Sequence, residues 1–139
     1  MFVPNEDNVY VMCGFNGKEI ESCHHFDVAT KTWRTLKSTP GARSVFAGVN
    51  MNGRYVVFGG EVDPGTQGHL GSGTMREDVA LFDPRDESWT PVKCEGTHRP
   101  CGRGWMEMAR LTANRVLLLG GLSSDNERLA DGYILTLHF

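Results

Sequence analysis

The stretch Val56-Val57-Phe58-Gly59-Gly60 decides the fold, because it is an apolar run that stops at a pair of glycines. Short runs rich in β-branched and aromatic residues and bounded by glycine are typical of buried strands. Similar runs that end in glycine occur at residues 8–14 and 115–121. The loop that follows the second run, residues 61–77, is acidic and has no counterpart elsewhere. The repeated part therefore indicates architecture, and the acidic loop is the place to look for function.

Each apolar run begins a longer unit that recurs along the chain. In the second unit the run is followed by Val79-Ala80-Leu81-Phe82-Asp83 and then by Ser88-Trp89-Thr90. Residues 23–27 and 32–36 have the same order in the first unit, and residues 132–137 follow the run in the third. Turn residues separate the two later segments, as expected between antiparallel strands. The unit therefore predicts neighbouring antiparallel strands, with little helix.

Two additional apolar runs, residues 44–49 and 105–111, precede the second and third units. The pair Asn52-Gly53 lies between the first of these runs and the next strand, and it favours a type I′ hairpin because both residues tolerate positive φ. The order of strands then predicts a complete second unit. The first unit lacks its inner strand, and the third lacks its outer strand.

This pattern resembles the kelch repeat, a four-stranded propeller blade of roughly 50 residues. The resemblance covers residues 8–139, with blades at 8–37, 42–93 and 103–139, and implies an all-β, partial kelch-type β-propeller. A generic β-sandwich is the alternative. Propellers typically contain ~4–8 blades. We therefore expect the C-terminal half of a roughly six-bladed protein, or a tail-to-head dimer that completes the propeller.

Composition restricts the partners and the compartment. The 139 residues include 14 Lys and Arg and 17 Asp and Glu, with no basic block, which argues against nucleic acid. The longest apolar run, residues 116–119, is far short of the ~20 residues of a membrane helix. The first residues show no signal-peptide pattern, and the four cysteines show no C-x-x-C spacing. We expect free thiols and a cytoplasmic protein.

The loop after the diglycine holds the candidate metal ligands Glu61, Asp63 and His69. Two carboxylates and one imidazole suit a first-row divalent ion such as Fe(II) or Mn(II). Spacing alone leaves a second interpretation open, in which Asp63 caps the turn at Pro64-Gly65 and His69 is solvated.

Several segments together resemble the specifier proteins of glucosinolate breakdown, a kelch group that includes nitrile-specifier, epithiospecifier and thiocyanate-forming proteins. They are residues 42–47, 59–62, 68–69 and 103–105. The resemblance implies Fe(II) held through a Glu-x3-Asp-x3-His motif. Glu61 and His69 stand at its outer positions, whereas Gly65 occupies the middle one. Asp63 is the candidate replacement ligand.

The same resemblance implies a function. Trp105 matches a family tryptophan near the pocket, and we assign Trp105 and Arg103 as candidate catalytic residues, with Arg103 as a loop anchor in the other interpretation. The expected activity is Fe(II)-assisted redirection of a thiohydroximate-type aglycone to a nitrile. The alternative is a non-catalytic kelch module that binds another protein, or an inactive fragment.

Overall fold

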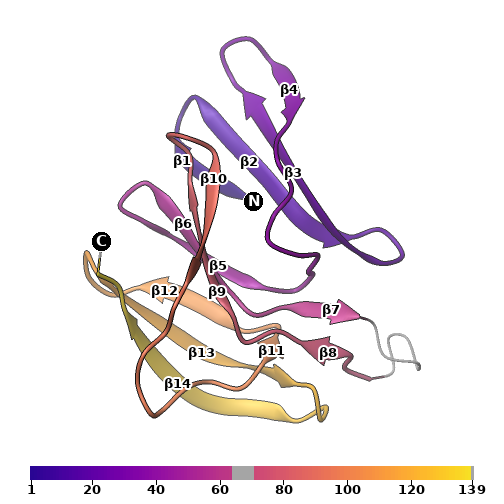
Figure 1. Cartoon of the computed structure of the whole chain (residues 1–139), viewed down its shortest axis with the longest axis vertical. Coiled ribbons are helices and arrows are strands. Elements are labelled where there is room, and N and C mark those ends of the chain that lie inside the picture. The colour runs from indigo at the N-terminus through magenta and orange to yellow at the C-terminus, as the bar shows by residue number, and fades with distance from the viewer. Residues whose placement is uncertain (64–70, 139) are drawn as a thin grey trace.

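The computed structural model describes residues 1–63 and 71–138, and these form three antiparallel β-sheets and one hairpin (Figure 1). The first sheet, called the first blade, has the order β1-β2-β3-β4. Its strands are β1 (Phe2–Asn5), β2 (Asn8–Phe15), β3 (Glu19–Asp27) and β4 (Thr32–Thr35). The described residues contain no α-helix. None of their segments is therefore a helix that could cross a bilayer.

The second blade has the order β5-β6-β9-β10, and the third is built around β13. The strands of the second blade are β5 (Ala47–Met51), β6 (Arg54–Phe58), β9 (Val79–Asp83) and β10 (Ser88–Val92). Those of the third are β11 (Arg103–Gly104), β12 (Glu107–Arg110), β13 (Arg115–Ser123) and β14 (Arg128–Thr136). β11 and β12 pair with different parts of β13, and β14 pairs with β13 as well. The four-stranded antiparallel sheets confirm the predicted all-β blade architecture.

The first blade is complete, so the expectation that it lacks its inner strand is wrong. β1 pairs with β2, with Phe2 opposite Tyr10 and Asn5 opposite Asn8. Phe2 is buried and its ring stacks on Tyr55 of the second blade, with centroids 4.7 Å apart. A four-residue strand that contains Pro4 and is followed by acidic residues gives a weak sequence signal. Packing against the second blade stabilises this strand despite its low propensity.

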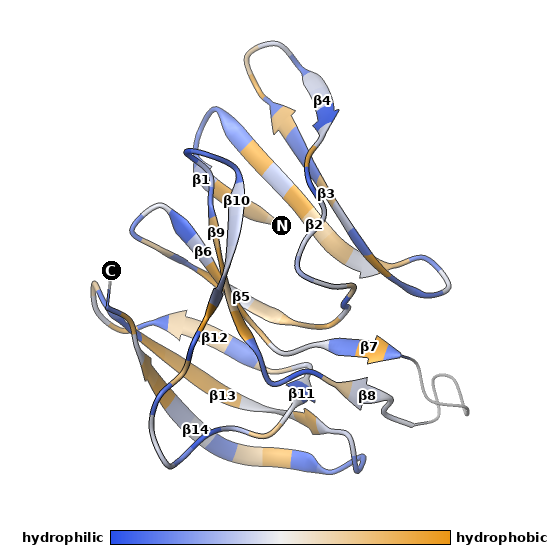
Figure 2. Cartoon of the chain, in the orientation of Figure 1, coloured by the Kyte–Doolittle hydropathy of each residue, from blue (hydrophilic) through white to orange (hydrophobic). Residues whose placement is uncertain are grey.

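Apolar side chains from facing sheets form two cores, one between each pair of neighbouring blades. The core between the first and second blades contains Phe2, Tyr10, Met12, Cys23, Tyr55, Val57, Ala80 and Phe82. The core between the second and third blades contains Ala47, Met51, Val56, Phe58, Val79, Met106, Met108, Val116, Leu118 and Leu137. Figure 2 shows apolar residues along the strands and hydrophilic residues in most turns. Alternation along the strands therefore places successive side chains in different cores.

Turn geometry repeats from blade to blade. The hairpin between β5 and β6 has positive φ at both Asn52 and Gly53, with Met51 opposite Arg54, which confirms the predicted turn. The diglycines Gly59-Gly60 and Gly120-Gly121 also have positive φ. A Cβ at Gly60 would lie 2.6 Å from the carbonyl oxygen of Ser44, so this approach requires glycine.

Candidate functional site

Glu61 begins the short strand β7 (Glu61–Asp63), which pairs with β8 (Thr74–Met75). The two strands form a hairpin that extends beyond the second blade in Figure 1. The backbone just before Glu61 is held by the third blade, because the Gly60 N–H donates to the Arg103 carbonyl at 2.9 Å. Glu61 and Ser44 exchange two backbone hydrogen bonds of 2.9 Å. The hairpin base is therefore fixed on two sides.

The side chain of Glu61 is buried, with 8% of its surface exposed. Its Oε1 accepts a hydrogen bond of 2.7 Å from the backbone N–H of Gly73. A second buried carboxylate, Glu19, accepts a hydrogen bond of 3.1 Å from the Ser44 hydroxyl. Ser44 thus connects two buried acids, one from each of the first two blades. The sequence gives no spacing signal for Glu19, because its nearness to Glu61 arises only from the packing of separate blades.

The other candidate ligands lie further along the same loop. Asp63 is exposed and pairs through its backbone with Thr74. His69 and Gly65 lie outside the described residues. Within residues 1–63 and 71–138, His, Cys, Asp and Glu side chains do not form a group of three placed to hold a metal ion. The candidate ligands that the structure describes are the carboxylates of Glu61 and Asp63, a type of ligand that Fe(II) and Mn(II) accept. The backbone of Glu61 is fixed by its hydrogen bonds to Ser44. The described residues therefore supply donors of a suitable chemical type, but not a complete set of ligands.

Arg103 is fully buried at the start of the third blade. Its guanidinium donates to the Asp131 carboxylate, at 2.5 and 3.0 Å, and to the Gly120 carbonyl at 3.0 Å. It also lies over the ring of Tyr133, 5.4 Å from the centroid. The hydrogen bonds from Arg103 hold the pKa of Asp131 below its ordinary value. These contacts make Arg103 the anchor of the diglycine in its own blade, and its backbone carbonyl holds Gly60 beside Glu61.

Arg43 has the same position in the second blade, and the sequence analysis did not select it. Its guanidinium donates to the Gly59 carbonyl at 3.1 Å and to the Asp78 carboxylate at 2.9 Å. Arg76 also donates to Asp78, at 2.7 Å. Burial alone would raise the pKa of Asp78, but the hydrogen bonds from Arg76 and Arg43 hold it below its ordinary value. The signal for Arg43 was present, since Arg43 and Arg103 each precede a diglycine by 16 or 17 residues.

Trp105 is 55% exposed, and its backbone has a φ of 52°. The Trp105 N–H donates to the Val45 carbonyl at 2.9 Å, and Val45 has the equivalent backbone angle, 47°. The conformation belongs to the repeat and not to one blade. It turns the indole away from the cores, so Trp105 is available for contact with a ligand or a partner.

These features define the class of protein. The structure has three neighbouring antiparallel sheets of four strands each. A buried arginine and a diglycine turn recur in the second and third blades, and an aromatic-Asp segment recurs in the first and second. Such a repeated four-stranded unit is typical of kelch-type propeller blades. All four cysteines are free thiols, as the sequence predicts.

Comparison with known proteins agrees with this class, although no family model matches the chain. The chain is 27% identical over 141 residues to N-(sulfonatooxy)prop-2-enimidothioate sulfolyase from Thlaspi arvense, an alignment that covers 96% of the chain and 40% of the relative. It is 28% identical to N-acetylneuraminate epimerase from Salmonella arizonae, covering 97% of the chain and 33% of the relative. Kelch domain-containing protein 1 from Mus musculus is 26% identical over 80% of the chain and 26% of its own length. The chain is thus a homologue of kelch-repeat proteins and of this sulfolyase, and it spans at most 40% of the length of these three relatives.

Proposed function

We propose that this chain provides the Fe(II)-binding loop of a specifier-type kelch protein, which redirects a thiohydroximate aglycone towards a nitrile. The observation that carries the proposal is the position of Glu61, a buried carboxylate fixed at a strand end in a chain that aligns over 96% of its length with the sulfolyase. Glu61, Asp63 and His69 are the proposed ligands. When bound, ferrous ion would supply a Lewis acid for the sulfur of the substrate.

The residues around the loop have defined tasks in this proposal. The Gly73 N–H fixes one carboxylate oxygen of Glu61 at 2.7 Å, which sets the direction of the other oxygen. The Arg103 carbonyl fixes the backbone of Gly60. Trp105, exposed and on the next blade, offers an apolar surface to the side chain of the substrate. Arg103 acts as a positioning residue, because its guanidinium is engaged with Asp131.

Anaerobic calorimetric titration with Fe(II) tests the metal site without an activity readout. We expect saturable binding by the unmodified chain and a loss of at least about tenfold in affinity for Glu61→Gln. Glutamine keeps an oxygen for the Gly73 N–H, so this change leaves the loop contact in place. The matched control is Glu6→Gln, an exposed glutamate in the turn between β1 and β2, which should leave affinity unchanged.

The activity is tested separately, by adding the chain and Fe(II) to a thioglucosidase and a glucosinolate and measuring nitrile against isothiocyanate. Nitrile formation that depends on Fe(II) and on Glu61 supports the proposal. Absence of both saturable Fe(II) binding and nitrile contradicts it and leaves the non-catalytic interaction module. Asp63→Asn distinguishes the replacement ligand, since unchanged Fe(II) affinity in that variant rules Asp63 out.

A further inference from the structure

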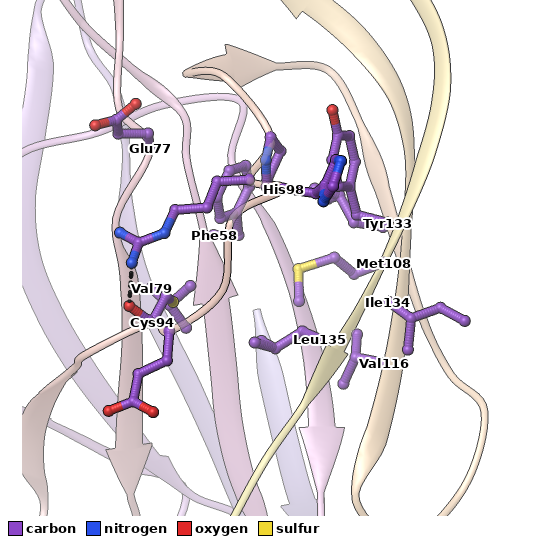
Figure 3. Close-up of a pocket in the computed structure, with 14 residues that line it drawn as sticks. Phe58, Glu77, Val79, Cys94, His98, Met108, Val116, Tyr133, Ile134 and Leu135 are labelled. Atoms are coloured by element: carbon purple, nitrogen blue, oxygen red, sulfur yellow. Dashed lines mark hydrogen bonds between the residues drawn. The ribbon is translucent and has the colours of Figure 1, made fainter.

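A cavity of about 140 Å³ lies between the second and third blades (Figure 3). Phe58, Met108 and Val116 line it and also belong to the core between these two blades. Its lining further includes four charged or titratable side chains, Glu77, Glu95, His98 and Arg99. Arg99 is held by the carbonyl of Cys94, to which its guanidinium donates at 2.6 Å. The cavity is therefore an outward extension of a core that the fold already contains.

A larger cleft of about 470 Å³ lies between the first and second blades. Pro4, Asn5 and Asn8 line one wall, at the turn between β1 and β2, and residues 84–87 line the other, at the turn between β9 and β10. In Figure 1 both turns lie at the ends of the blades that point away from the β7–β8 hairpin. Each of these two blades has all four strands. The cleft therefore belongs to a complete pair of blades, and its volume is within the ~300–1,000 Å³ that is typical of small-molecule sites.

Tyr10 and His25 are the buried residues of the lining, 3% and 6% exposed, and are called the floor of the cleft. They lie opposite each other on β2 and β3, and their rings stack with centroids 4.8 Å apart. The ring of Tyr10 also packs against Phe82, at 5.0 Å. Burial, and next the charge of Glu87, raise the pKa of Tyr10, so its hydroxyl is protonated at neutral pH. Because other rings occupy the ring faces, the floor offers polar edge atoms and not a surface for stacking.

The hydrogen bonds of His25 show which atom of its ring lacks a partner. The side-chain N–H of Asn8 donates to Asn5 Oδ1 at 2.9 Å, which leaves Asn8 Oδ1 to face His25 Nε2 at 2.6 Å. Because that oxygen only accepts, Nε2 carries the proton, and Nδ1 of the neutral ring has a free lone pair. Nδ1 is buried and has no hydrogen-bond partner among residues 1–63 and 71–138. Buried polar atoms are nearly always paired, so Nδ1 indicates a donor group that enters from the cleft.

The charged side chains around the cleft balance one another. Arg34 of β4 donates through both terminal nitrogens to Glu87, which joins the first blade to the second. Arg85 and Asp86 add one further charge of each sign to the lining. A paired guanidinium keeps unused N–H groups, and a paired carboxylate keeps unused lone pairs. The walls therefore offer both donors and acceptors without a net charge.

We propose that this cleft binds a small neutral polyhydroxy compound, whose hydroxyl groups reach the floor beside the Arg34–Glu87 pair. A hydroxyl both donates and accepts, so one such group donates to His25 Nδ1 while others accept from Tyr10 and Arg34. A carboxylate or phosphate would lie against Asp86 and Glu87, and an ammonium group would lie against the two arginines. The site is separate from the proposed iron-binding loop, because it lies at the other end of the blades.

The test follows the imidazole nitrogens of the ¹⁵N-labelled chain by NMR while D-glucose or D-mannitol is added. We expect a saturable shift of His25 Nδ1, because a new hydrogen bond forms there. His24 is the internal control and should not shift, since successive residues of β3 point to opposite faces of the sheet. A response to glucose alone identifies a cyclic sugar as the ligand, and a response to mannitol alone identifies an open-chain polyol. Both of these outcomes support the proposal.

Charged counterparts of the sugar test the balance of the walls. D-glucuronate and D-glucosamine each carry one charge at neutral pH, and both should bind at least about tenfold more weakly than the neutral probe. The absence of a saturable shift of His25 with both neutral probes overturns the proposal. Equal affinity for a neutral and a charged probe overturns it as well.

Two tyrosine variants locate the site. Tyr10→Phe removes the hydroxyl on the floor, keeps the ring packing, and should weaken binding about three- to tenfold, the net effect of one hydrogen bond. Tyr55→Phe removes a hydroxyl from the same core but does not line the cleft, so binding should stay within about twofold. Equal losses in the two variants would show an effect of the core and would overturn the assignment to the cleft. If Tyr10→Phe disturbs folding, the response of His25 in the unmodified chain still decides the question.

Discussion

The two cores between blades are built from different side chains, although the same repeat generates both. Between the first and second blades, rings pack against rings: Phe82 contacts Phe2, Tyr10 and Trp89, with centroids 5.0 to 6.3 Å apart. Between the second and third blades, the buried side chains are mainly aliphatic or methionine, including Met51, Met106, Met108 and Leu118. Flat rings fix their neighbours through shape, whereas methionine adapts to irregular space.

The difference shows how a repeat can keep its backbone and vary its packing. Buried arginines at equivalent positions and the glycine turns preserve the backbone in the second and third blades. Gly14 and Gly60 each donate to the carbonyl of the arginine that opens the next blade, at 2.9 Å in both cases. The side chains between these fixed points are then free to differ. We expect the two cores to respond differently to matched changes.

The largest effect is expected from Arg103. In Arg103→Met the Gly120 carbonyl and the Asp131 carboxylate lose their buried donor, and because solvent reaches the 40% exposed Asp131 side chain, this should cost about 2–4 kcal/mol in the free energy of unfolding. Arg43→Met should cost less, because Arg76 still donates to Asp78. Urea denaturation of both variants measures the difference. Equal losses would show that the second arginine at Asp78 has no compensating role.

The packing of the two cores can be compared by swaps that approximately conserve volume. Phe82→Leu removes three ring contacts and should cost about 1–3 kcal/mol. Leu118→Met, at a buried position that lines the cavity between the other two blades, should cost under about 1.5 kcal/mol. Thermal unfolding checks both. A larger loss for Leu118→Met would mean that the methionine-rich core is the more precisely packed one.

The sequence predicts those parts of the fold that depend on local signals. The diglycine after Phe58, the Asn52-Gly53 hairpin and the tryptophan strands were all found from neighbouring residues. β1 was missed because Phe2 is stabilised by Tyr55 of another blade, a contact with no local sign.

The same distinction between local signals and contacts across blades holds for the residues of the candidate site. Glu61 was selected because it follows a diglycine, and the structure places it at a fixed strand end. Glu19 was not selected, since only the packing of two blades brings it to Ser44. The roles of Asp63, His69 and Trp105 towards a metal or a substrate stay predictions.

Alkaline pH should destabilise the core between the first and second blades, which contains Cys23 and Tyr55, before the other core. Burial raises the pKa of the Cys23 thiol to about 11, from an ordinary 9.0, and that of Tyr55 to about 12, from 10.0. Both groups stay protonated in the folded state while the unfolded chain ionises. Their contribution to stability is therefore complete below pH 9 and is lost as pH rises through 11 and 12. We expect a loss of about 1–2 kcal/mol between pH 9 and 10.

Urea midpoints at pH 7, 9 and 10 measure this loss, and hydrogen exchange locates it. Cys23→Ala should remove the thiol part of the pH dependence, because the ionising group is gone. On the other side of the second blade, burial raises the pKa of the half-buried Cys94 as well. Exchange that accelerates first between the second and third blades would contradict the assignment to Cys23 and Tyr55.

The smallest losses in the free energy of unfolding are expected where polar side chains of neighbouring blades contact each other at the surface. Arg34 of the first blade forms an exposed ion pair with Glu87 of the second. Across the other pair of blades, Asn52 donates to the Ala113 carbonyl at 2.9 Å and accepts from Arg110 at 3.3 Å, without a pair of opposite charges. Glu87→Gln should cost about 0–1 kcal/mol, because solvent screens an exposed pair.

The dependence on salt distinguishes the Arg34–Glu87 ion pair from the Asn52 hydrogen bonds, even where the two contribute similar free energies. The cost of Glu87→Gln should fall as NaCl is raised from 0.01 to 1 M (assay conditions), because the Debye length falls from about 30 to about 3 Å over that range. Asn52→Gly keeps a residue that tolerates positive φ and removes hydrogen bonds in which at least one partner is uncharged, so its cost should change little with salt. Unfolding midpoints at the two salt concentrations decide the matter. A salt-independent Glu87→Gln would mean that Arg34 is held by its shape and packing against the second blade, and not by the charge of Glu87.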